Sequence, residues 1–334
     1  YALGHELRTG LPPNRESRSK ECAVWTGAVG GLAPVHSFFL EHTMTHRFNH
    51  ISFLTDYGTR DEFVGIVKCV VADIAPHVQV IDITHDVPAF DVRAGSLALA
   101  RAVSYVPKGV ILAVVDPGVG TSRRAIAVSV SGGDGVFIGP DNGLLAMGVA
   151  LAGGAEFAVE LTNTKYHLPS PGTTFAGRDI FGSVAAHICN GVELSELGNE
   201  IDTASLLPGI IPITREENGQ LVGEVTWVDH FGNCQLNIGP EEIAQWGSPV
   251  RVAIGNPDSP NHIVRSVPIV RNFSEIGGGI GLVIDSFGML ALCTDRGSAA
   301  AELDLGPTNM VTISQDPNAG GGVSTTVRLG SKPN

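Results

Sequence analysis

A carboxylate and a guanidinium lie seven residues apart, on either side of a glycine-rich turn. Asp116 follows the apolar run 110–115, and Arg123 precedes the apolar run 125–130. Short apolar runs rich in β-branched residues predict buried strands. The turn then places Asp116 and Arg123 where they can form a hydrogen-bonded ion pair at a strand end, which is where open α/β sheets bind their ligands. The alternative is a structural turn with a surface ion pair of little energetic value.

The glycines of this turn could also be taken for a nucleotide-binding loop. Gly118 and Gly120 are spaced as in such loops. A phosphate-binding loop must open a helix, because the helix N-terminus holds the phosphate. The residues that follow, 125–130, alternate and are β-branched, so we expect a strand there and reject the phosphate loop.

Two further acids follow apolar runs, Asp56 after 51–55 and Asp141 after 136–140. A carboxylate can accept two hydrogen bonds side by side, which suits the paired hydroxyls of a ribose. Aspartate is equally common as a helix N-cap. We favour the N-cap for Asp141, and the local sequence leaves both interpretations of Asp56 open.

The second half of the chain carries a polar island between predicted strands, residues 229–233. Asn233 can offer a donor and an acceptor to an adenine edge, and Phe231 can stack on a base. An ordinary hairpin turn ending in Gly-Asn is the alternative. Farther on, Ser286 could bind a carboxylate, or could belong to a turn.

These residues need a scaffold of two kinds. From residue 51 to about 190, strands and helices alternate, which predicts a mostly parallel, Rossmann-like α/β sheet. From residue 221, short strands with turns predict a smaller β-barrel or sandwich. The expected organisation is a leader (1–47), an N-terminal α/β domain (48–193), a linker (194–216), a C-terminal β-barrel domain (217–315) and a flexible tail (316–334).

Composition narrows the possible partners. The formal net charge of −13 argues against nucleic acid and against an anionic membrane surface. Five scattered cysteines without a CxxC motif fit a reducing compartment, so we expect a cytoplasmic protein. The leader does not have the pattern of a signal peptide, and Met44 could be the natural start. His42, His46 and His50 are spaced for a helical metal site, but they have no carboxylate or cysteine partner, and we predict no metal.

Several islands taken together resemble the S-adenosyl-L-methionine (SAM) hydroxide adenosyltransferases, or SAM hydrolases, which are related to the fluorinating and chlorinating SAM enzymes. The islands run in family order over about residues 50–305. They are Thr55-Asp-Tyr-Gly-Thr-Arg-Asp61, Asp82-Ile-Thr-His85, Val115-Asp-Pro-Gly-Val-Gly-Thr121 with Arg123, Gly139-Pro-Asp-Asn-Gly-Leu-Leu145, Phe175-Ala-Gly-Arg-Asp-Ile-Phe181, Asp229-His-Phe-Gly-Asn233 with Asn237-Ile238, and Arg296-Gly-Ser-Ala299.

The resemblance implies SAM as the substrate, no cofactor, and a homotrimer with the sites at subunit interfaces. It assigns the ribose hydroxyls to Asp56, with Phe90 as a wall. It assigns adenine to Phe231 and Asn233, with the backbone near Arg296. It assigns the methionine amine and carboxylate to Asp229 and Ser286. Asp61, Phe175 and Gly177 complete the implied substrate-binding set.

The family uses an Asp-Arg-His set to position and activate water. Asp116 and Arg123 match the first two, but Ala176 stands where the histidine is expected. The expected reaction is hydrolysis of SAM to adenosine and L-methionine by in-line attack of water on ribose C5′. The alternatives are a halide (chloride) adenosyltransferase of the same fold, or a SAM- or adenosine-binding protein impaired by Ala176. Neither His167 nor His230 is an obvious replacement for the missing histidine.

Overall fold

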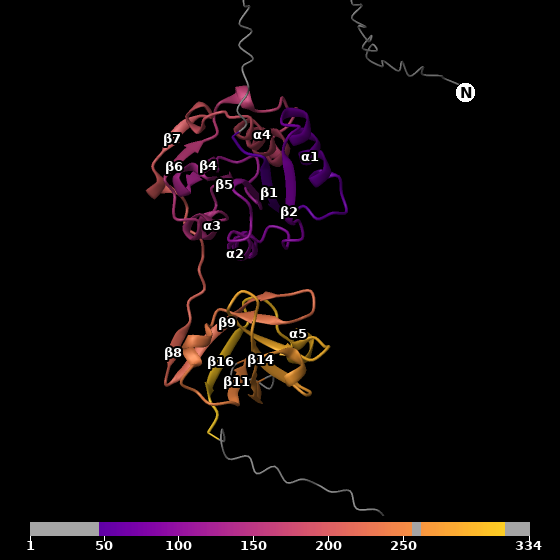
Figure 1. The fold of residues 1–334 in the computed structure, drawn as a ribbon, viewed down its shortest axis with the longest axis vertical. Coiled ribbons are helices and arrows are strands. Elements are labelled where there is room, and N and C mark those ends of the chain that lie inside the picture. The colour runs from indigo at the N-terminus through magenta and orange to yellow at the C-terminus, as the bar shows by residue number, and fades with distance from the viewer. Residues whose placement is uncertain (1–46, 256–261, 318–334) are drawn as a thin grey trace, which may run out of the picture. The chain divides into compact units, whose positions relative to one another are not determined.

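The computed structural model describes residues 47–255 and 262–317, which form two β-sheets (Figure 1). His42 and His46 lie outside the described residues, as do almost all of the predicted leader and tail. No helix in the described residues is long and apolar enough to span a membrane.

The first sheet is mixed. Parallel pairing joins β2 to β1, β1 to β3 and β3 to β5, whereas β4 is antiparallel to both β5 and β6, and β7 is antiparallel to β6. Residues 131–134 alone join β4 to β5, too few for the crossover that a parallel pair requires. The sheet is therefore parallel only in its first half, and its Rossmann-like character stays a prediction. In spatial order the strands are β2 (Gln79–Thr84), β1 (His50–Thr55), β3 (Gly109–Val114), β5 (Gly135–Pro140), β4 (Ala125–Val130), β6 (Phe157–Glu160) and β7 (Asn199–Ile201).

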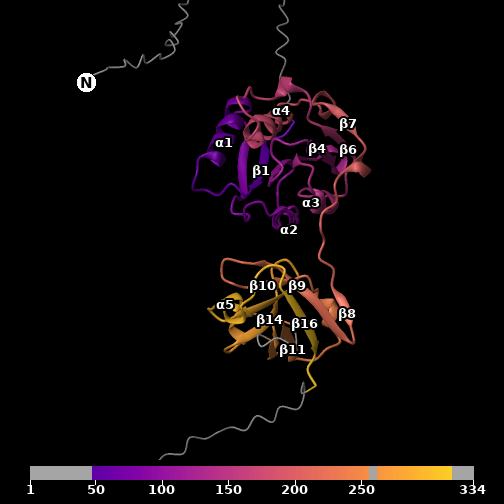
Figure 2. The ribbon, with the colours of Figure 1, turned by 180° about the vertical axis from the view of Figure 1, so that it is seen from behind.

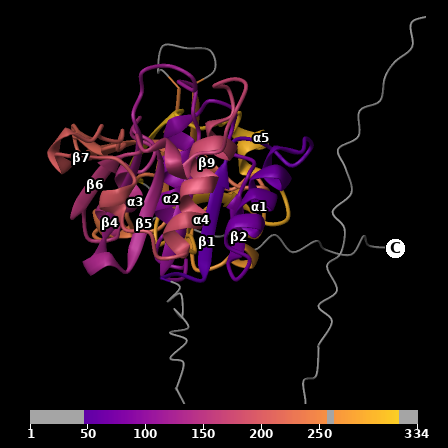
Figure 3. The same cartoon turned by 90° about the horizontal axis from the view of Figure 1, so that it is seen from above.

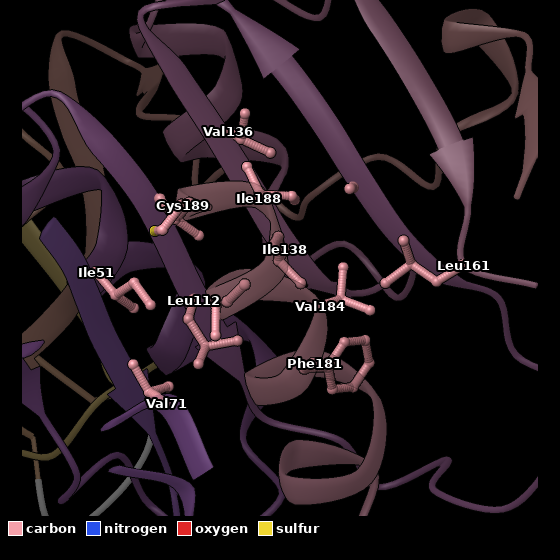
Figure 4. Close-up of a cluster of buried hydrophobic side chains, with 14 of the residues drawn as sticks. Ile51, Val71, Leu112, Val136, Ile138, Leu161, Phe181, Val184, Ile188 and Cys189 are labelled. Atoms are coloured by element: carbon pink, nitrogen blue, oxygen red, sulfur yellow. The ribbon is translucent and has the colours of Figure 1, made fainter. Parts of the chain in front are cut away.

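Helices cover both faces of this sheet (Figure 3). Side chains alternate along a strand, so Phe53 packs toward α1 (Phe63–Ile74) and α4 (Ser183–Cys189), while Leu54 packs toward α2 (Val92–Ala102) and α3 (Ala146–Leu151). Figure 4 shows the first of these layers, in which strand residues meet Phe181 and Val184. Figure 2 shows α1, α2, α3 and α4 with the molecule turned by 180° from the view of Figure 1. A π-helical segment, η3 (Gly177–Gly182), leads directly into α4.

The second sheet is nearly closed, which agrees with the predicted barrel. The two ends of its strand path, β12 and β13, are separated in the chain only by Pro268, whose carbonyl accepts from the Leu282 N–H. The path is β12 (Ile263–Val267), β11 (Val250–Ile254), β16 (Met310–Gln315), β9 (Gln220–Val228), β10 (Cys234–Leu236), β15 (Leu290–Thr294), β14 (Ile280–Ile284) and β13 (Ile269–Val270), with β8 (Arg215–Glu217) paired to β9.

The stretch expected as a linker, 194–216, has structure at both ends. Its first part supplies β7 to the first sheet, and Arg215 already belongs to β8. Strand β7 was not predicted, because three residues are too few to display a period. The boundaries of the two domains stay predictions.

Candidate functional site

Two neighbouring parallel strands bring their acids to the same edge of the first sheet. Thr55 lies opposite Val114, so the residues after β1 and β3 emerge side by side. Asp56 and Asp116 both line a cavity of about 270 Å³ at this edge. The predicted residues Phe90, Phe175, Ala176 and Gly177 line it as well, together with Tyr57, Phe63, Ala89, Val119 and Thr174.

Asp116 and Arg123 form a buried ion pair, as their spacing predicted. Arg123 Nε lies 2.8 Å from Oδ1 and 3.0 Å from Oδ2, and Nη2 makes a third contact to Oδ2. The side chains are 5% exposed for Asp116 and 15% for Arg123, and the guanidinium carbon lies 5.1 Å from the centre of the Phe181 ring. The surface ion-pair interpretation is therefore wrong. A carboxylate can accept about four hydrogen bonds, so Asp116 can still accept one from a ligand in the cavity.

Asp56 is held at the mouth of the same cavity by the chain after β2. Its Oδ2 accepts from the Phe90 N–H at 2.8 Å. Phe90 has a φ of 67°, uncommon for a residue other than glycine, and the residue is 72% exposed. No group in the described residues donates to Oδ1 of Asp56, so this oxygen can accept from a ligand hydroxyl. Asp56 is not an N-cap, since α1 begins after Glu62.

A polar chain that runs from buried Thr55 and His85 to exposed Asp82 and Lys68 supports the loop that carries Asp56. Thr55 Oγ1 lies 2.8 Å from Nδ1 of His85, and Nε2 of His85 lies 3.0 Å from Asp82 Oδ1. Lys68 adds an ion pair to Asp82 at 2.6 Å, and the Gly58 N–H donates to the His85 carbonyl at 2.7 Å. The loops after β1 and β2 are thus joined below the cavity. This contact gives the Asp82-Ile-Thr-His85 island a structural role, which could not be predicted from the sequence.

Tyr57 is a cavity residue that the candidate site omitted. Its ring packs against Phe63 and Phe175, with ring centres 6.0 and 5.9 Å away. Burial, then the carboxylates of Asp56 and Asp116, raise the pKa of Tyr57 above its ordinary value, so its hydroxyl stays protonated. A Cβ on Gly177 would lie 2.1 Å from that hydroxyl oxygen, which accounts for the glycine. In the sequence, the feature that could have pointed to Tyr57 as a site residue is its position directly after Asp56.

Two acids lie outside the cavity. Asp61 is exposed and is not among the lining residues. The N-cap assigned to Asp141 is wrong. Its Oδ2 accepts from Arg124 Nε at 2.9 Å, its Oδ1 accepts from the Leu207 N–H, and Asn142 instead accepts from the N–H of Leu144. Asp141 and Arg124 form a second ion pair, in which the Asp141 side chain is buried and that of Arg124 is 28% exposed, one residue along from Arg123.

The island at 229–233 is a tight turn after β9. Asp229 accepts from the backbone N–H groups of Phe231 and Asn233, at 2.9 and 2.8 Å, and from the Asn233 side-chain amide at 2.8 Å. The turn interpretation is thus correct for Asp229. It leaves Phe231 73% exposed, with its ring centre 5.5 Å from that of the neighbouring His230.

The remaining predicted residues are also exposed. Ser286 lines a different cavity, of about 530 Å³, with Arg101 and Phe287. The Arg296 side chain is 92% exposed, and its φ is 56°. In the described residues, none of the predicted C-terminal site residues lines the cavity of Asp56 and Asp116.

Fold and site together define a class: a mixed α/β sheet with a small acidic cavity at its strand ends, followed in the chain by a nearly closed β-sheet. Comparison with known proteins agrees. The model of the SAM hydroxide adenosyltransferase N-terminal domain matches residues 51–198, and that of its C-terminal domain matches residues 223–312. The chain therefore belongs to the SAM hydroxide adenosyltransferase family.

The chain is also similar to individual proteins, one of them named a hydrolase of SAM. An (R)-S-adenosyl-L-methionine hydrolase from Salinispora tropica is 41% identical over 266 residues, covering 79% of this chain and 97% of the relative. A fluorinase from an Actinoplanes strain is more distant, at 27% identity over 79% of this chain and 97% of its own length. The crystal structure of an uncharacterized conserved protein from Thermotoga maritima superposes with a TM-score of 0.71 at 33% identity, covering 79% of this chain and all of that one.

Proposed function

We propose that this protein is an enzyme that hydrolyses SAM to adenosine and L-methionine. The observation that carries the proposal is the buried Asp116–Arg123 pair, whose carboxylate faces the same cavity as Asp56. Asp56 can hold the ribose, and Asp116 can hold a water near C5′ of that ribose. Relatives at 35–41% identity are named (R)-S-adenosyl-L-methionine hydrolase.

The reaction needs little beyond placement of the nucleophile. The sulfonium of SAM leaves as a neutral thioether, so water need only sit in line with the C5′–S bond, about 3–3.5 Å from the carbon. Asp116 accepts a hydrogen bond from this water and Arg123 keeps the carboxylate in one orientation. The water oxygen bonds to C5′, the C5′–S electron pair moves to sulfur, and one proton is released. No metal or redox cofactor is required by this scheme.

Halide transfer is the rival reaction within the same fold. An anionic nucleophile at this site would lie beside the Asp116 carboxylate, in a cavity that also holds Asp56. Coulomb repulsion disfavours that arrangement, whereas neutral water is attracted to it. The other rival is a protein that binds SAM or adenosine without turnover because Ala176 replaces a histidine.

An isotope experiment separates these possibilities. The enzyme is incubated with SAM in ¹⁸O-water containing chloride, and the products are analysed by mass spectrometry. We expect adenosine that carries ¹⁸O at its 5′ oxygen, together with unlabelled methionine. Formation of 5′-chloro-5′-deoxyadenosine would establish the halide reaction, and calorimetric binding of SAM without any product would establish the binding protein.

We also propose that a second copy of the chain completes each site, in a cytoplasmic homotrimer. Phe231, Asn233 and Arg296 do not line the cavity of their own chain's Asp56, and Phe231 is 73% exposed. An exposed ring beside polar groups suits the adenine of a substrate held by the N-terminal domain of a neighbour. The cytoplasmic location is proposed because the five scattered cysteines of the sequence, without a CxxC motif, fit a reducing compartment.

Replacing Asp56 should weaken binding more than chemistry. In Asp56→Asn, the amide oxygen can still accept from the Phe90 N–H, but the NH₂ group then faces the ligand where a carboxylate oxygen accepted a hydroxyl. Hydrogen bonds to charged groups are worth about 1.5–3 kcal/mol, so the Kd for adenosine should rise about 10- to 150-fold. Isothermal titration with adenosine measures this.

Asp91→Asn is the matched control for that experiment. Asp91 lies next to Phe90 and caps α2 through the Ala94 N–H at 2.9 Å, and asparagine caps as well as aspartate. The same change of charge close to the cavity should therefore leave the Kd unchanged. An equal loss in both variants would mean that Asp56 acts only through the general field.

A further inference from the structure

The side chains that line the cavity of Asp56 and Asp116 include few hydrogen-bond donors. An ionised carboxylate only accepts hydrogen bonds, and the other polar side chains in the lining are the hydroxyls of Tyr57 and Thr174. Thr174 is exposed, whereas Tyr57 is half-buried. No histidine of the described residues lines this cavity, since His167 lines a second cavity, of about 630 Å³, that shares one lining residue with it. Tyr57 is therefore the hydroxyl that the fold encloses beside the two acids.

The Tyr57 hydroxyl has no hydrogen-bond partner in the described residues, although the N–H of the same residue donates to Thr55 Oγ1 at 3.2 Å. It is also not one of the fully covered polar atoms that lack a partner, such as Ser52 Oγ on β1. The Tyr57 oxygen therefore keeps accessible surface, and Tyr57 lines the cavity. Buried polar groups are nearly always hydrogen-bonded to protein or to ordered water, so a half-buried hydroxyl of this kind indicates a bound water or a ligand oxygen.

Aromatic packing and one glycine determine where this hydroxyl lies. The Tyr57 ring contacts Phe63 and Phe175, with ring centres 6.0 and 5.9 Å away, and those two rings are 5.1 Å apart. A Cβ on Gly177 would lie 2.1 Å from the Tyr57 oxygen and 3.1 Å from Cζ. Phe63, Phe175 and Gly177 all line the cavity. The oxygen thus lies against the backbone of the cavity wall, one residue from Ala176, where the side chain is only a methyl group.

Both carboxylates of the cavity act on this hydroxyl. Burial raises the pKa of Tyr57, the charges of Asp56 and Asp116 raise it further, and Arg123 lowers it. Interactions between charges weaken with distance, so the hydroxyl lies near both acids. Because the negative charges repel a phenolate, the hydroxyl keeps its proton. It can therefore donate or accept a hydrogen bond beside Asp116, but it does not act as a base.

We propose that the Tyr57 hydroxyl is a further catalytic group, which holds the attacking water together with Asp116. The inference rests on the proposed function and extends it. The water donates one hydrogen to the Asp116 carboxylate and the other to the Tyr57 oxygen, so that a lone pair can point at C5′. As the water oxygen bonds to C5′ and the C5′–S pair moves to sulfur, one proton passes to Asp116 and then to solvent. Tyr57 keeps its own proton, and the transferred oxygen becomes the 5′ hydroxyl of adenosine beside the same two groups.

The test compares two ligands that differ by this one oxygen, adenosine and 5′-deoxyadenosine. Tyr57→Phe removes only the phenol oxygen and keeps the ring packing on Phe63 and Phe175. Loss of a neutral hydrogen bond should raise the Kd for adenosine by about 2- to 13-fold, while the Kd for 5′-deoxyadenosine changes by less than about twofold. Isothermal titration measures both values without any turnover. With SAM, kcat should fall by about tenfold, because a water held by one group is less often in line with the C5′–S bond.

Gly177→Ala tests the position of the hydroxyl independently. In the parent enzyme the added methyl group would displace the Tyr57 oxygen, whereas in Tyr57→Phe its nearest contact would be Cζ at 3.1 Å. We therefore expect Gly177→Ala to lower kcat about as much as Tyr57→Phe does, and the double variant to be no slower than Tyr57→Phe. Losses that multiply in the double variant would overturn the proposed position of the hydroxyl.

Tyr166→Phe is the matched control. The Tyr166 hydroxyl donates to Glu196 at 3.0 Å, and Tyr166 does not line the cavity. This variant should lose stability in urea unfolding but keep kcat and both Kd values. Tyr57→Phe should keep its stability, because its hydroxyl has no partner in the described residues.

Three results would overturn the role of Tyr57, and they are distinguishable. If Tyr57→Phe keeps kcat within about twofold of the parent and binds adenosine as tightly, Tyr57 does not hold the water, and the proposed hydrolase stands. If the Kd rises equally for both ligands, Tyr57 contacts the nucleoside and not the water. If the parent enzyme itself releases no adenosine from SAM, the proposed function and the role of Tyr57 fall together.

Discussion

Asp116→Asn is expected to reduce the kcat for SAM hydrolysis by about 10²–10⁴-fold, with KM changed by only a few-fold. The amide can no longer accept from both Nε and Nη2 of Arg123, as the carboxylate does, and it turns an N–H toward one of these donors. The water would lose its acceptor, while the groups proposed to hold the ribose remain. Steady-state kinetics with chromatographic detection of adenosine measures the effect.

The same substitution should cost stability, and the chain offers a control for that. Removing one partner of a buried pair leaves an uncompensated charge, at a cost of about 3–5 kcal/mol. Asp141→Asn removes the partner of Arg124 in the neighbouring pair, where the Asp141 side chain is 3% exposed. Asp141 does not line the cavity of Asp116. Both variants should lose stability in urea unfolding, but only Asp116→Asn should lose kcat per folded molecule. Equal kcat losses would reduce Asp116 to a structural role.

Recovery of activity in mixed trimers is the second large effect that we expect. Asp116→Asn disables the N-terminal part of a site and Phe231→Ala the C-terminal part. Loss of stacking on a base costs about 1–3 kcal/mol, so Phe231→Ala should be about 5- to 150-fold slower at low SAM. If each site combines two chains, random mixing gives an intact site in about a quarter of cases. Purification of tandem-tagged, co-expressed trimers through both tags removes the unmixed trimers, and every mixed trimer then has one intact site in three. Such trimers should show about a third of the parent activity, above either variant alone.

Mixing two defects from the same part of the site is the control. Asp116→Asn and Asp56→Asn both alter the N-terminal cavity. Every site in such a mixed trimer carries one defect or the other, so no recovery is expected. If the Asp116→Asn and Phe231→Ala mixture also yields only the average of its components, each site lies within one chain.

Much of the site could be predicted from local patterns in the sequence. Strands β1, β3 and β4 are apolar on both faces and are buried, as their runs predicted, and a strand rather than a helix follows the Gly118-Val-Gly120 turn. The pairing of Asp116 with Arg123 followed from seven residues across one turn. Such features depend on the period of the backbone and the reach of side chains, which a local stretch of sequence contains.

The prediction that Asp141 caps a helix was wrong because Asp141 bonds to residues that are distant in the sequence. Its carboxylate takes Arg124 from the neighbouring strand and the Leu207 N–H from a loop 66 positions away. These partners outcompete the local N–H groups that a cap would use. Tyr57 was missed likewise, because its value to the site depends on contact with Gly177, which is far away in the chain.

The sequence by itself therefore determined most of the strands of the two sheets, which acids stand at the ends of the apolar strands, and the family to which these islands belong. Only the tertiary structure decided that β4 is antiparallel, that the loops after β1, β2 and β3 enclose one cavity with Phe175 and Ala176, and that His167 lines the cavity next to it. The physical reason is that these neighbours are brought together by packing of two cores over the faces of one sheet, and not by any spacing along the chain.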